Sequence, residues 1–530
     1  MVSYFCATPL GFVLLVVSFR ISSIVAHNIL VLSPITTNSH SNFIKPVAKA
    51  LADRGHTVTY WNGLPPDKET LTNPKANLNL LYSPGLRPLN DNHQVGYDDR
   101  PFQLLLAIPD RMATYCTAIY RDPVFHQLMS STEQFDLLII EALFNECVLP
   151  LVRKFDVPFV YMVSMTPSPW LLDAVGSSLA LDHLPHAGSN YADEMDFWQR
   201  TYNTISGMMI TYFHRFFVIP VVDRLASEIL KLNNQPSVFE IQSEYMSLII
   251  SNTHFSINYQ FPASPALIQA GGLHCLPSKQ LPKDLESFVD GSGDAGFIVV
   301  SFGSVLRGSD ISDHVRQLFL STFSRLPQRV IWKWEEKLDE TDSIPSNVKL
   351  LPWMPQQDLL GHPKIRLLIT HGGLNSKQEA VYHGVPFIAL PVFADQPINA
   401  QKAHDDGYAI RLDWDNLTEE ILFDAIQRIL SNSSYVERMN QVSALMRDQT
   451  DRPLDRAVYW IEYVIRHQGA SHLRSASRKL SLFQRCLIDV LLFTLFLLLF
   501  LLISVFLLCR FVHQKVLHET NLQTSTKKTD

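Results

Sequence analysis

Apolar residues follow two different patterns along this chain, helical spacing and continuous runs, and the order of these patterns predicts the secondary structure. In the segment 41–55, apolar residues recur at helical spacing and Gly55 follows as a stop signal, which predicts an amphipathic helix. Apolar runs lie on both sides of this helix, so the three segments form a strand–helix–strand unit of a parallel sheet. Strands of this kind are predicted at 27–35, 56–61, 135–144 and 157–164, and again at 296–304, 329–335, 348–351, 365–371, 386–391 and 408–413. Helices are predicted at 312–326 and over 418–468.

The restart of this pattern in the second half of the chain predicts two doubly wound α/β domains. The stretch 281–296 is rich in Gly, Asp and Ser and has the composition of a linker. We therefore place a first domain at 27–285 and a second at 286–470. The aromatic-rich segments 100–130 and 167–240 interrupt the simple alternation in the first domain, and we expect them to line a pocket.

The two ends of the chain carry segments that lie outside these domains. Residues 9–19 are apolar but too short to span a bilayer, and small residues follow as far as Ala26. This pattern predicts a secretory signal peptide at 1–26 that is cleaved near Ala26, with an uncleaved anchor as the alternative. A signal peptide would direct the two domains to the lumen of the endoplasmic reticulum.

Near the other end, residues 490–509 carry no charged side chain. As a helix, this run is about 30 Å long, which matches the thickness of the hydrocarbon core of a bilayer. We predict a transmembrane helix at 487–509 and a cytosolic tail at 510–530, which is a single-pass type I arrangement. The final Lys-Lys-Thr-Asp resembles a dilysine retrieval signal, so we expect a protein of the endoplasmic reticulum membrane.

Composition narrows the function classes further. The net charge is −7 and 47% of residues are hydrophobic, which argues against a nucleic-acid partner and allows a large core. Outside the apolar ends only Cys116, Cys147 and Cys275 remain, so no disulfide framework is predicted, although one bridge is allowed. The sequence has no CxxC or HExxH motif, so it suggests no zinc site. The tripeptides at Asn416 and Asn432 are glycosylation acceptors if they are lumenal.

The segment 367–397 carries the most specific local chemistry. His371 and Gly373 follow a predicted strand, and Asn375 and Ser376 then open a helix. Ligands of doubly wound sheets bind at the carboxyl ends of strands, and a helix N-terminus favours an anion. The local pattern therefore predicts a diphosphate site with His371 as an added donor.

Two other interpretations of this segment are possible. The chain has no Walker loop and no GxGxxG fingerprint, so neither of those phosphate motifs applies. Ser376 and Glu379 have the spacing of a capping box, which would contribute about 1 kcal/mol to the helix. A Glu379 side chain that caps the helix could not also bind a ribose.

The longer stretch 353–396, WMPQQDLLGHPKIRLLITHGGLNSKQEAVYHGVPFIALPVFADQ, resembles the donor-binding signature of the UDP-glycosyltransferase family. The sequences GGLHC at 271–275 and FGS at 302–304 also fit this family, and the resemblance covers nearly the whole chain. It implies the GT-B fold, with the sugar nucleotide in the second domain and the acceptor in the first. The implied donor contacts are Trp353 on uracil, Gln356 and Glu379 on ribose, Ser304, His371, Gly373, Asn375 and Ser376 on the diphosphate, and Asp395 and Gln396 on the sugar.

The resemblance also implies a base in the first domain, because the attacking acceptor hydroxyl must lose its proton. His40, between the first strand and its helix, matches the catalytic histidine of the family. The family commonly has an Asp near the end of the strand 135–144, whereas this chain has Glu141, with Glu146 as a nearby alternative. Because the N-terminus of a helix disfavours an imidazolium, we expect His40 to be neutral.

The reaction that the resemblance implies is a single inverting displacement that forms a β-glycoside and needs no metal. Asp-Trp-Asp at 413–415 resembles a metal-binding motif of another glycosyltransferase fold, but it follows the wrong strand, so we interpret it as a solvated helix entrance. The branch of the family that uses glucuronic acid usually has an Arg where this chain has Ser251. Without a guanidinium to pair with a carboxylate, UDP-glucose is favoured as the donor.

The acceptor is expected to be a small lipophilic alcohol or phenol, as in detoxification, because the first domain is rich in aromatic residues. Two alternatives remain at this stage. One is a transferase that uses UDP-glucuronic acid, and the other is a non-catalytic relative that binds a UDP-sugar and partners with an active enzyme. The presence of His40 favours an enzyme, and a homo-oligomer is left open.

Overall fold

The computed structural model describes residues 26–526 except 68–70, 73–74, 92–100, 188, 232–235, 304–306, 308–309 and 336–343. The predicted signal peptide, apart from Ala26, lies outside the described residues. The same holds for Ser304 and for the terminal dilysine sequence.

The first sheet contains seven parallel strands in the order β3-β2-β1-β4-β5-β6-β7. Its central strands are buried and continuously apolar, as expected for a sheet that is covered on both faces. The strands are β1 (Asn28–Ser33), β2 (Thr57–Asn62), β3 (Leu78–Tyr82), β4 (Leu137–Glu141), β5 (Phe159–Val163), β6 (Met246–Ser251) and β7 (Leu267–Gln269).

The second sheet contains six parallel strands in the order β10-β9-β8-β11-β12-β13. Its strands are β8 (Phe297–Ser301), β9 (Arg329–Lys333), β10 (Val348–Leu351), β11 (Ile365–Thr370), β12 (Phe387–Ala389) and β13 (Ala409–Arg411). The strand order reverses between β1 and β4 in the first sheet and between β8 and β11 in the second. Such reversal points are where doubly wound sheets bind ligands. The predicted fold class of two Rossmann-like domains is confirmed.

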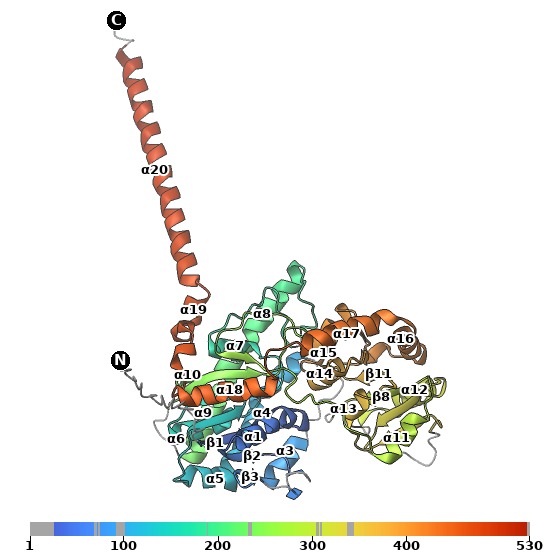
Figure 1. Ribbon diagram of the computed structural model, residues 1–530. Helices are drawn as coiled ribbons and strands as arrows, with labels where there is room; N and C mark the ends of the chain where they lie inside the picture. The colour runs from blue at the N-terminus through green and yellow to red at the C-terminus, as the bar shows by residue number, and fades with distance from the viewer. Residues whose placement is uncertain are drawn as a thin grey trace, which may run out of the picture.

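Helices cover both sheets (Figure 1). Those of the first half are α1 (Asn38–Asp53), α3 (Arg87–Asp91), α4 (Pro101–Arg121), α5 (Pro123–Ser130), α6 (Leu149–Phe155), α7 (Pro169–Val175), α8 (Phe197–Phe213), α9 (Ile219–Leu230) and α10 (Val238–Tyr245). Those of the second half are α11 (Lys283–Asp290), α12 (Asp313–Ser324), α13 (Gln356–Leu360), α14 (Leu374–His383), α15 (Gln396–Asp405), α16 (Glu419–Ser431), α17 (Ser433–Arg447) and α18 (Pro453–Arg466). Short helical turns connect several of them, among them η2 (Glu146–Val148), η3 (His214–Val218), η5 (Trp414–Asn416) and η7 (Ala476–Lys479).

Helix α18 returns from the second sheet to the first. Its side chains Ala457, Val458 and Ile461 belong to the core of the first sheet, and Glu462 pairs with Arg54 of α1 at 3.1 Å. The chain then leaves the body through α19 (Leu482–Arg485) and α20 (Ile488–Thr526), and α20 stands away from both domains in Figure 1. By length and composition α20 is a candidate membrane span over Ile488–His518, with its side chains exposed.

One disulfide joins Cys116 of α4 to Cys147 of η2. Cys275 is buried and free. Disulfides persist in oxidising compartments and are rare in the cytosol. The structure thus contains the single bridge that the sequence allowed, and this bridge joins α4 to the turn that follows β4.

Candidate active site

A cavity of about 1010 Å³ is lined by residues of both sheets. One wall comes from the segments after β1, β4 and β5, and the other from those after β8, β11 and β12. The points at which the strand order reverses in the two sheets therefore open into the same cavity, and a ligand there would touch both domains.

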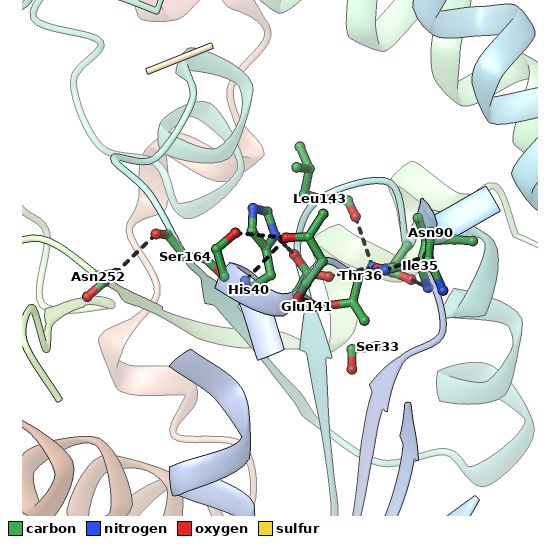
Figure 2. Close-up of polar contacts among 12 residues, drawn as sticks. Ser33, Ile35, Thr36, His40, Asn90, Glu141, Leu143, Ser164 and Asn252 are labelled. Carbon is green, nitrogen blue, oxygen red and sulfur yellow. Dashed lines mark hydrogen bonds and ion pairs between the residues drawn. The ribbon is translucent and has the colours of Figure 1, made fainter. Parts of the chain in front are cut away.

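His40 lies in the first turn of α1 and lines this cavity. The side chain of Thr37 caps the helix by accepting a hydrogen bond from the backbone N–H of His40. The Nδ1 atom of His40 is 2.5 Å from the Oε1 atom of Glu141, the last residue of β4 (Figure 2). The structure thus brings together the two residues that the sequence proposed, and the longer stem of Glu141 reaches the ring.

Asn145 holds Glu141 from the other side. Its Nδ2 donates to the Oε2 of Glu141 at 3.1 Å and to the carbonyl of Ile35 at 2.8 Å, while its Oδ1 accepts from the N–H of Ile35 at 3.0 Å. Glu146 does not contact His40 but pairs with His214 at 3.1 Å. Asn145 was not predicted from the sequence, and only its place just after β4 could have pointed to it.

The pKa of His40 shifts in the opposite direction from the one expected. Burial disfavours its charged form, but the Glu141 carboxylate outweighs burial through its charge and its hydrogen bond, and Asp395 adds to this effect. The pKa of His40 is therefore raised above its ordinary value. The helix N-terminus was expected to disfavour the imidazolium, but the pKa moves the other way because Glu141 is in direct contact with the ring.

His371 follows β11 on the opposite wall of the cavity. Burial, together with the nearby charge of Lys333, lowers the pKa of His371 to about 4, so its ring is neutral at physiological pH. Gly303 and Gly373 surround it, and a Cβ added to either glycine would lie 2.7 or 2.5 Å from the ring. Both glycines therefore leave room for the imidazole beside the N-terminus of α14.

Glu379 of α14 also faces the cavity. Its Oε2 accepts a hydrogen bond from the Nε2 of Gln356 at 2.5 Å, and the same Nε2 lies 3.2 Å from the Oγ of Ser376. Burial raises the pKa of Glu379 to about 7. The capping-box alternative is wrong, because α14 is capped at Gly373 without any side-chain bond.

Asp395 and Gln396 mark the start of α15 and line the cavity. The Oδ2 of Asp395 accepts from the Nδ2 of Asn399 at 2.8 Å. The Oε1 of Gln396 accepts from the N–H groups of Val392 and Phe393 at 2.8 and 3.2 Å. The Nε2 of Gln396 is thereby turned away from these backbone groups, and it can donate to a ligand hydroxyl.

Trp353 presents a broad ring to the same cavity, with 67% of the residue exposed. The ammonium of Lys333 lies 5.8 Å from the centre of this ring. An exposed indole of this kind is a platform on which a flat base can stack.

Asn375 has a different environment from the one expected. Its Nδ2 donates to the carbonyl of Ser39 at 2.8 Å, and its Oδ1 accepts from the Nδ2 of Asn252 at 2.7 Å. Ser39 and Asn252 both belong to the first domain, and Ser39 directly precedes His40. The side chain of Asn375 therefore joins the two domains next to His40.

The remaining sequence candidates are exposed, although Asp415 also lines the cavity. Asp413 and Asp415 are exposed, and the carboxylate of Asp413 pairs with Arg411 at 3.3 Å. Asn416 and Asn432 are exposed as well. Within the described ranges, no group of three or more His, Cys, Asp or Glu side chains could hold a metal ion.

The protein has two Rossmann-like sheets that share a cavity at the points where their strand orders reverse. This arrangement defines the class of GT-B glycosyltransferases. Solved structures show the same fold. The glycosyltransferase VinC in complex with dTDP matches with a TM-score of 0.56 at 17% identity, over 83% of this chain and 100% of that one. The calicheamicin glycosyltransferase CalG4 matches with a TM-score of 0.55 at 18% identity, over 83% and 98%.

The family model for UDP-glucoronosyl and UDP-glucosyl transferases matches residues 28–523, so the chain belongs to this family. The UDP-glycosyltransferase UGT5 of Dactylopius coccus is 33% identical over 500 residues, which cover 94% of this chain and 93% of that protein. The UDP-glucuronosyltransferase 2B14 of Oryctolagus cuniculus is 34% identical over 420 residues, 78% of each chain. The protein is a UDP-glycosyltransferase, a hexosyltransferase that uses a UDP-sugar as co-substrate.

Proposed function

We propose that the protein transfers glucose from UDP-glucose to the hydroxyl of a small lipophilic acceptor and forms a β-glycoside. The observation that carries this proposal is the His40–Glu141 contact at 2.5 Å, which faces the same cavity as Asp395 and Gln396 of the other domain. A base and a set of sugar-binding groups thus meet across one space.

In this mechanism His40 is the general base. Its Nδ1 is engaged by Glu141, so Nε2 takes the proton of the acceptor hydroxyl. The acceptor oxygen bonds to the anomeric carbon as the bond from that carbon to the β-phosphate oxygen breaks, and UDP leaves with the electron pair. Glu141 stabilises the imidazolium that forms. One displacement inverts the anomeric configuration.

The leaving diphosphate gains negative charge as the bond breaks. The free N–H groups at the start of α14, next to His371 and Gly373, lie on the cavity wall and suit this charge. Trp353 would stack on uracil, and Gln356 with Glu379 would bind the ribose. We propose that these fixed donors take the place of a metal.

The choice of glucose rests on charge. Ser251 is fully buried, and its Oγ lies 2.7 Å from that of Thr253, so this position supplies no cation to the cavity. The basic groups that act on Asp395 are His40 and Lys377. A neutral hydroxymethyl group needs no guanidinium partner at this position, whereas a glucuronate carboxylate would find none at residue 251.

The acceptor class follows from the first-domain wall of the cavity. Its apolar residues include Phe144, Trp170, Leu181, Leu184 and Ile210. A lipophilic alcohol or phenol would bury apolar surface against these side chains at about 25 cal/mol per Å².

The direct test compares donors. Membranes that contain the protein are given a simple phenol with UDP-glucose or with UDP-glucuronic acid, and the glycoside is measured. We expect product from UDP-glucose. Product mainly from UDP-glucuronic acid would overturn the choice of sugar, and UDP binding without product from either donor across a panel of phenols and alcohols would favour the non-catalytic alternative.

The hydrogen bonds of Asn375 to Ser39 and Asn252 lead to a separate prediction. Asn375→Ala should lower kcat by about 10- to 100-fold, because small shifts of a reacting group are costly, and leave UDP affinity unchanged. Asn252→Ala should have the same effect, and the double variant should be little worse than either, because both remove one network. Equal losses of kcat and UDP affinity would instead identify Asn375 as a diphosphate ligand.

We also propose a lumenal orientation in the endoplasmic reticulum membrane, which the Cys116–Cys147 disulfide and the apolar α20 support. Deleting residues 527–530 should release the protein to later compartments, as measured by maturation of its glycans at Asn416 and Asn432. Unchanged retention of the deletion variant would show that another segment holds the protein. Replacing both asparagines with Gln should abolish the increase in apparent mass that the glycans cause. A persisting increase would place the glycans elsewhere.

A further inference from the structure

Arg111 of α4 is a charged residue in a wall of the cavity that is otherwise apolar or neutral. Among the described residues between 37 and 210 that line the cavity, it is the only Lys, Arg, Asp or Glu. Its guanidinium forms no hydrogen bond or ion pair with any residue that the structure describes, although the side chain is partly buried. Removing a charge from water without a partner costs free energy, which an anionic ligand would offset.

The position of Arg111 on α4 places its charge on the first-domain side of the cavity. Ile108, Arg111 and Tyr115 are spaced by three and four residues, so they share one face of the helix. Ile108 also lines the cavity, and the ring of Tyr115 lies 5.6 Å from the ring of Phe144. Burial raises the pKa of Tyr115 and the charge of Arg111 partly opposes this effect, so the guanidinium lies near the phenol.

Phe144 links this part of the wall to the His40–Glu141 pair. It follows Glu141 by three residues and lines the cavity. Its φ of 59° lies in the left-handed region, which is uncommon for a bulky residue, and such strain persists mainly at ligand-binding sites. The loop after β4 therefore runs from the carboxylate that contacts His40 to the ring that packs beside Arg111.

The donor does not supply the anion for Arg111 in the proposed arrangement. The proposed diphosphate contacts, His371, Gly373 and the start of α14, lie on the second-domain wall. The carboxylates of Glu379 and Asp395 belong to that wall as well. The ligand on the first-domain side is the acceptor, so the acceptor is the molecule that would carry the anionic group.

We propose that Arg111 binds a carboxylate of the acceptor, so that the preferred acceptors are lipophilic hydroxy acids. This acceptor class rests on the proposed function and narrows it. A guanidinium presents two parallel N–H groups that match the two oxygens of a carboxylate. With its hydroxyl at His40 and its carboxylate at Arg111, the acceptor is held at two points, which limits the orientations that the hydroxyl can take. Its apolar body then packs on Phe144 and Trp170.

The test compares para-hydroxyphenyl carboxylic acids, whose alkyl linker is lengthened one methylene at a time, with their neutral methyl esters. The affinity for each compound is measured by calorimetry on the full chain saturated with UDP. We expect the wild type to bind the best-fitting acid about 10- to 100-fold more tightly than its ester, the effect of hydrogen bonds between charged groups. Because binding is measured without sugar transfer, the result stands even if the proposed reaction fails.

Arg111→Gln should remove most of this preference for the acid. Arg111→Lys keeps the charge but loses the paired N–H groups, so it should retain an intermediate preference. Arg121→Gln is the matched control, because Arg121 lies on the same helix, is exposed and does not line the cavity. The control should keep the wild-type preference. Thermal unfolding checks that each variant is folded, and Arg111→Lys decides the outcome if Arg111→Gln is not.

Three results would overturn the proposal. If the wild type binds every acid no more tightly than its ester, Arg111 does not bind an acceptor carboxylate. If folded Arg111→Gln loses affinity for acid and ester by the same factor, the role of Arg111 is structural. If the variant instead loses affinity for UDP, or for UDP-glucuronic acid alone, the guanidinium serves the donor.

Discussion

His40→Ala is expected to lower turnover by about 10²- to 10⁴-fold, the usual contribution of a general base. In the proposed mechanism the imidazole takes the proton of the acceptor hydroxyl, and its Nδ1 is already bonded to Glu141 at 2.5 Å. The donor groups lie on the opposite wall, so UDP should bind the variant as it binds the wild type. Turnover is measured by product formation and UDP binding by calorimetry.

His183→Ala is the matched control, because His183 is an exposed histidine outside the cavity wall. This control should keep full activity. Wild-type turnover by His40→Ala would remove His40 from the mechanism, and loss of UDP binding in the same variant would show that the substitution disturbs the donor site instead.

Asp395→Ala is expected to reduce kcat/KM for the sugar donor by about 10- to 100-fold, the effect of losing a hydrogen bond to a charged group. Asp395 is buried at the start of α15 and lies within electrostatic reach of His40, where the proposed mechanism requires the transferred sugar to lie. Affinity for UDP, which lacks the sugar, should be unchanged.

Asp413→Ala tests whether any nearby carboxylate has this effect. Asp413 is exposed and pairs with Arg411, so its loss should leave kcat/KM within about twofold, as for most surface changes. If Asp395→Ala weakens UDP binding as much as donor use, Asp395 contacts the nucleotide and not the sugar.

The sheets could be predicted because their strands are buried on both faces and appear as unbroken apolar runs, as in β4 and β8. The inner strand β6 was not predicted although it is fully buried. The two edge strands of the first sheet escaped prediction for the opposite reason. β3 is only partly buried, and β7 has three residues, so neither produces a long apolar run.

The cavity wall that carries the proposed donor contacts could be anticipated because its residues are close in sequence. His371, Glu379 and Asp395 fall within one stretch, and the spacing of that stretch carries the resemblance. The hydrogen bonds of Asn375 to the first domain could not be predicted, because the one to Ser39 joins residues 336 positions apart. Such a contact depends on how the two domains meet, and no local pattern records it.

The basicity of His40 shows the same limit. The sequence placed His40 at a helix N-terminus, where a positive charge is disfavoured, but it could not show a carboxylate in contact with the ring. The structure adds that contact, and Asn145 fixes the carboxylate in place. The three-dimensional arrangement therefore reverses the direction of the expected pKa shift.

The most direct measurement of the central claim is the pH dependence of kcat for the wild type and for Glu141→Gln. Only neutral His40 can accept a proton, so activity should fall as the pH drops through its pKa, which lies above the ordinary histidine value. Removing the carboxylate charge should lower this pKa, so the acid limb of Glu141→Gln should move to lower pH while its maximal rate falls. An acid limb that stays in place in the variant would contradict the account, because Glu141 would then have no part in setting the basicity of His40.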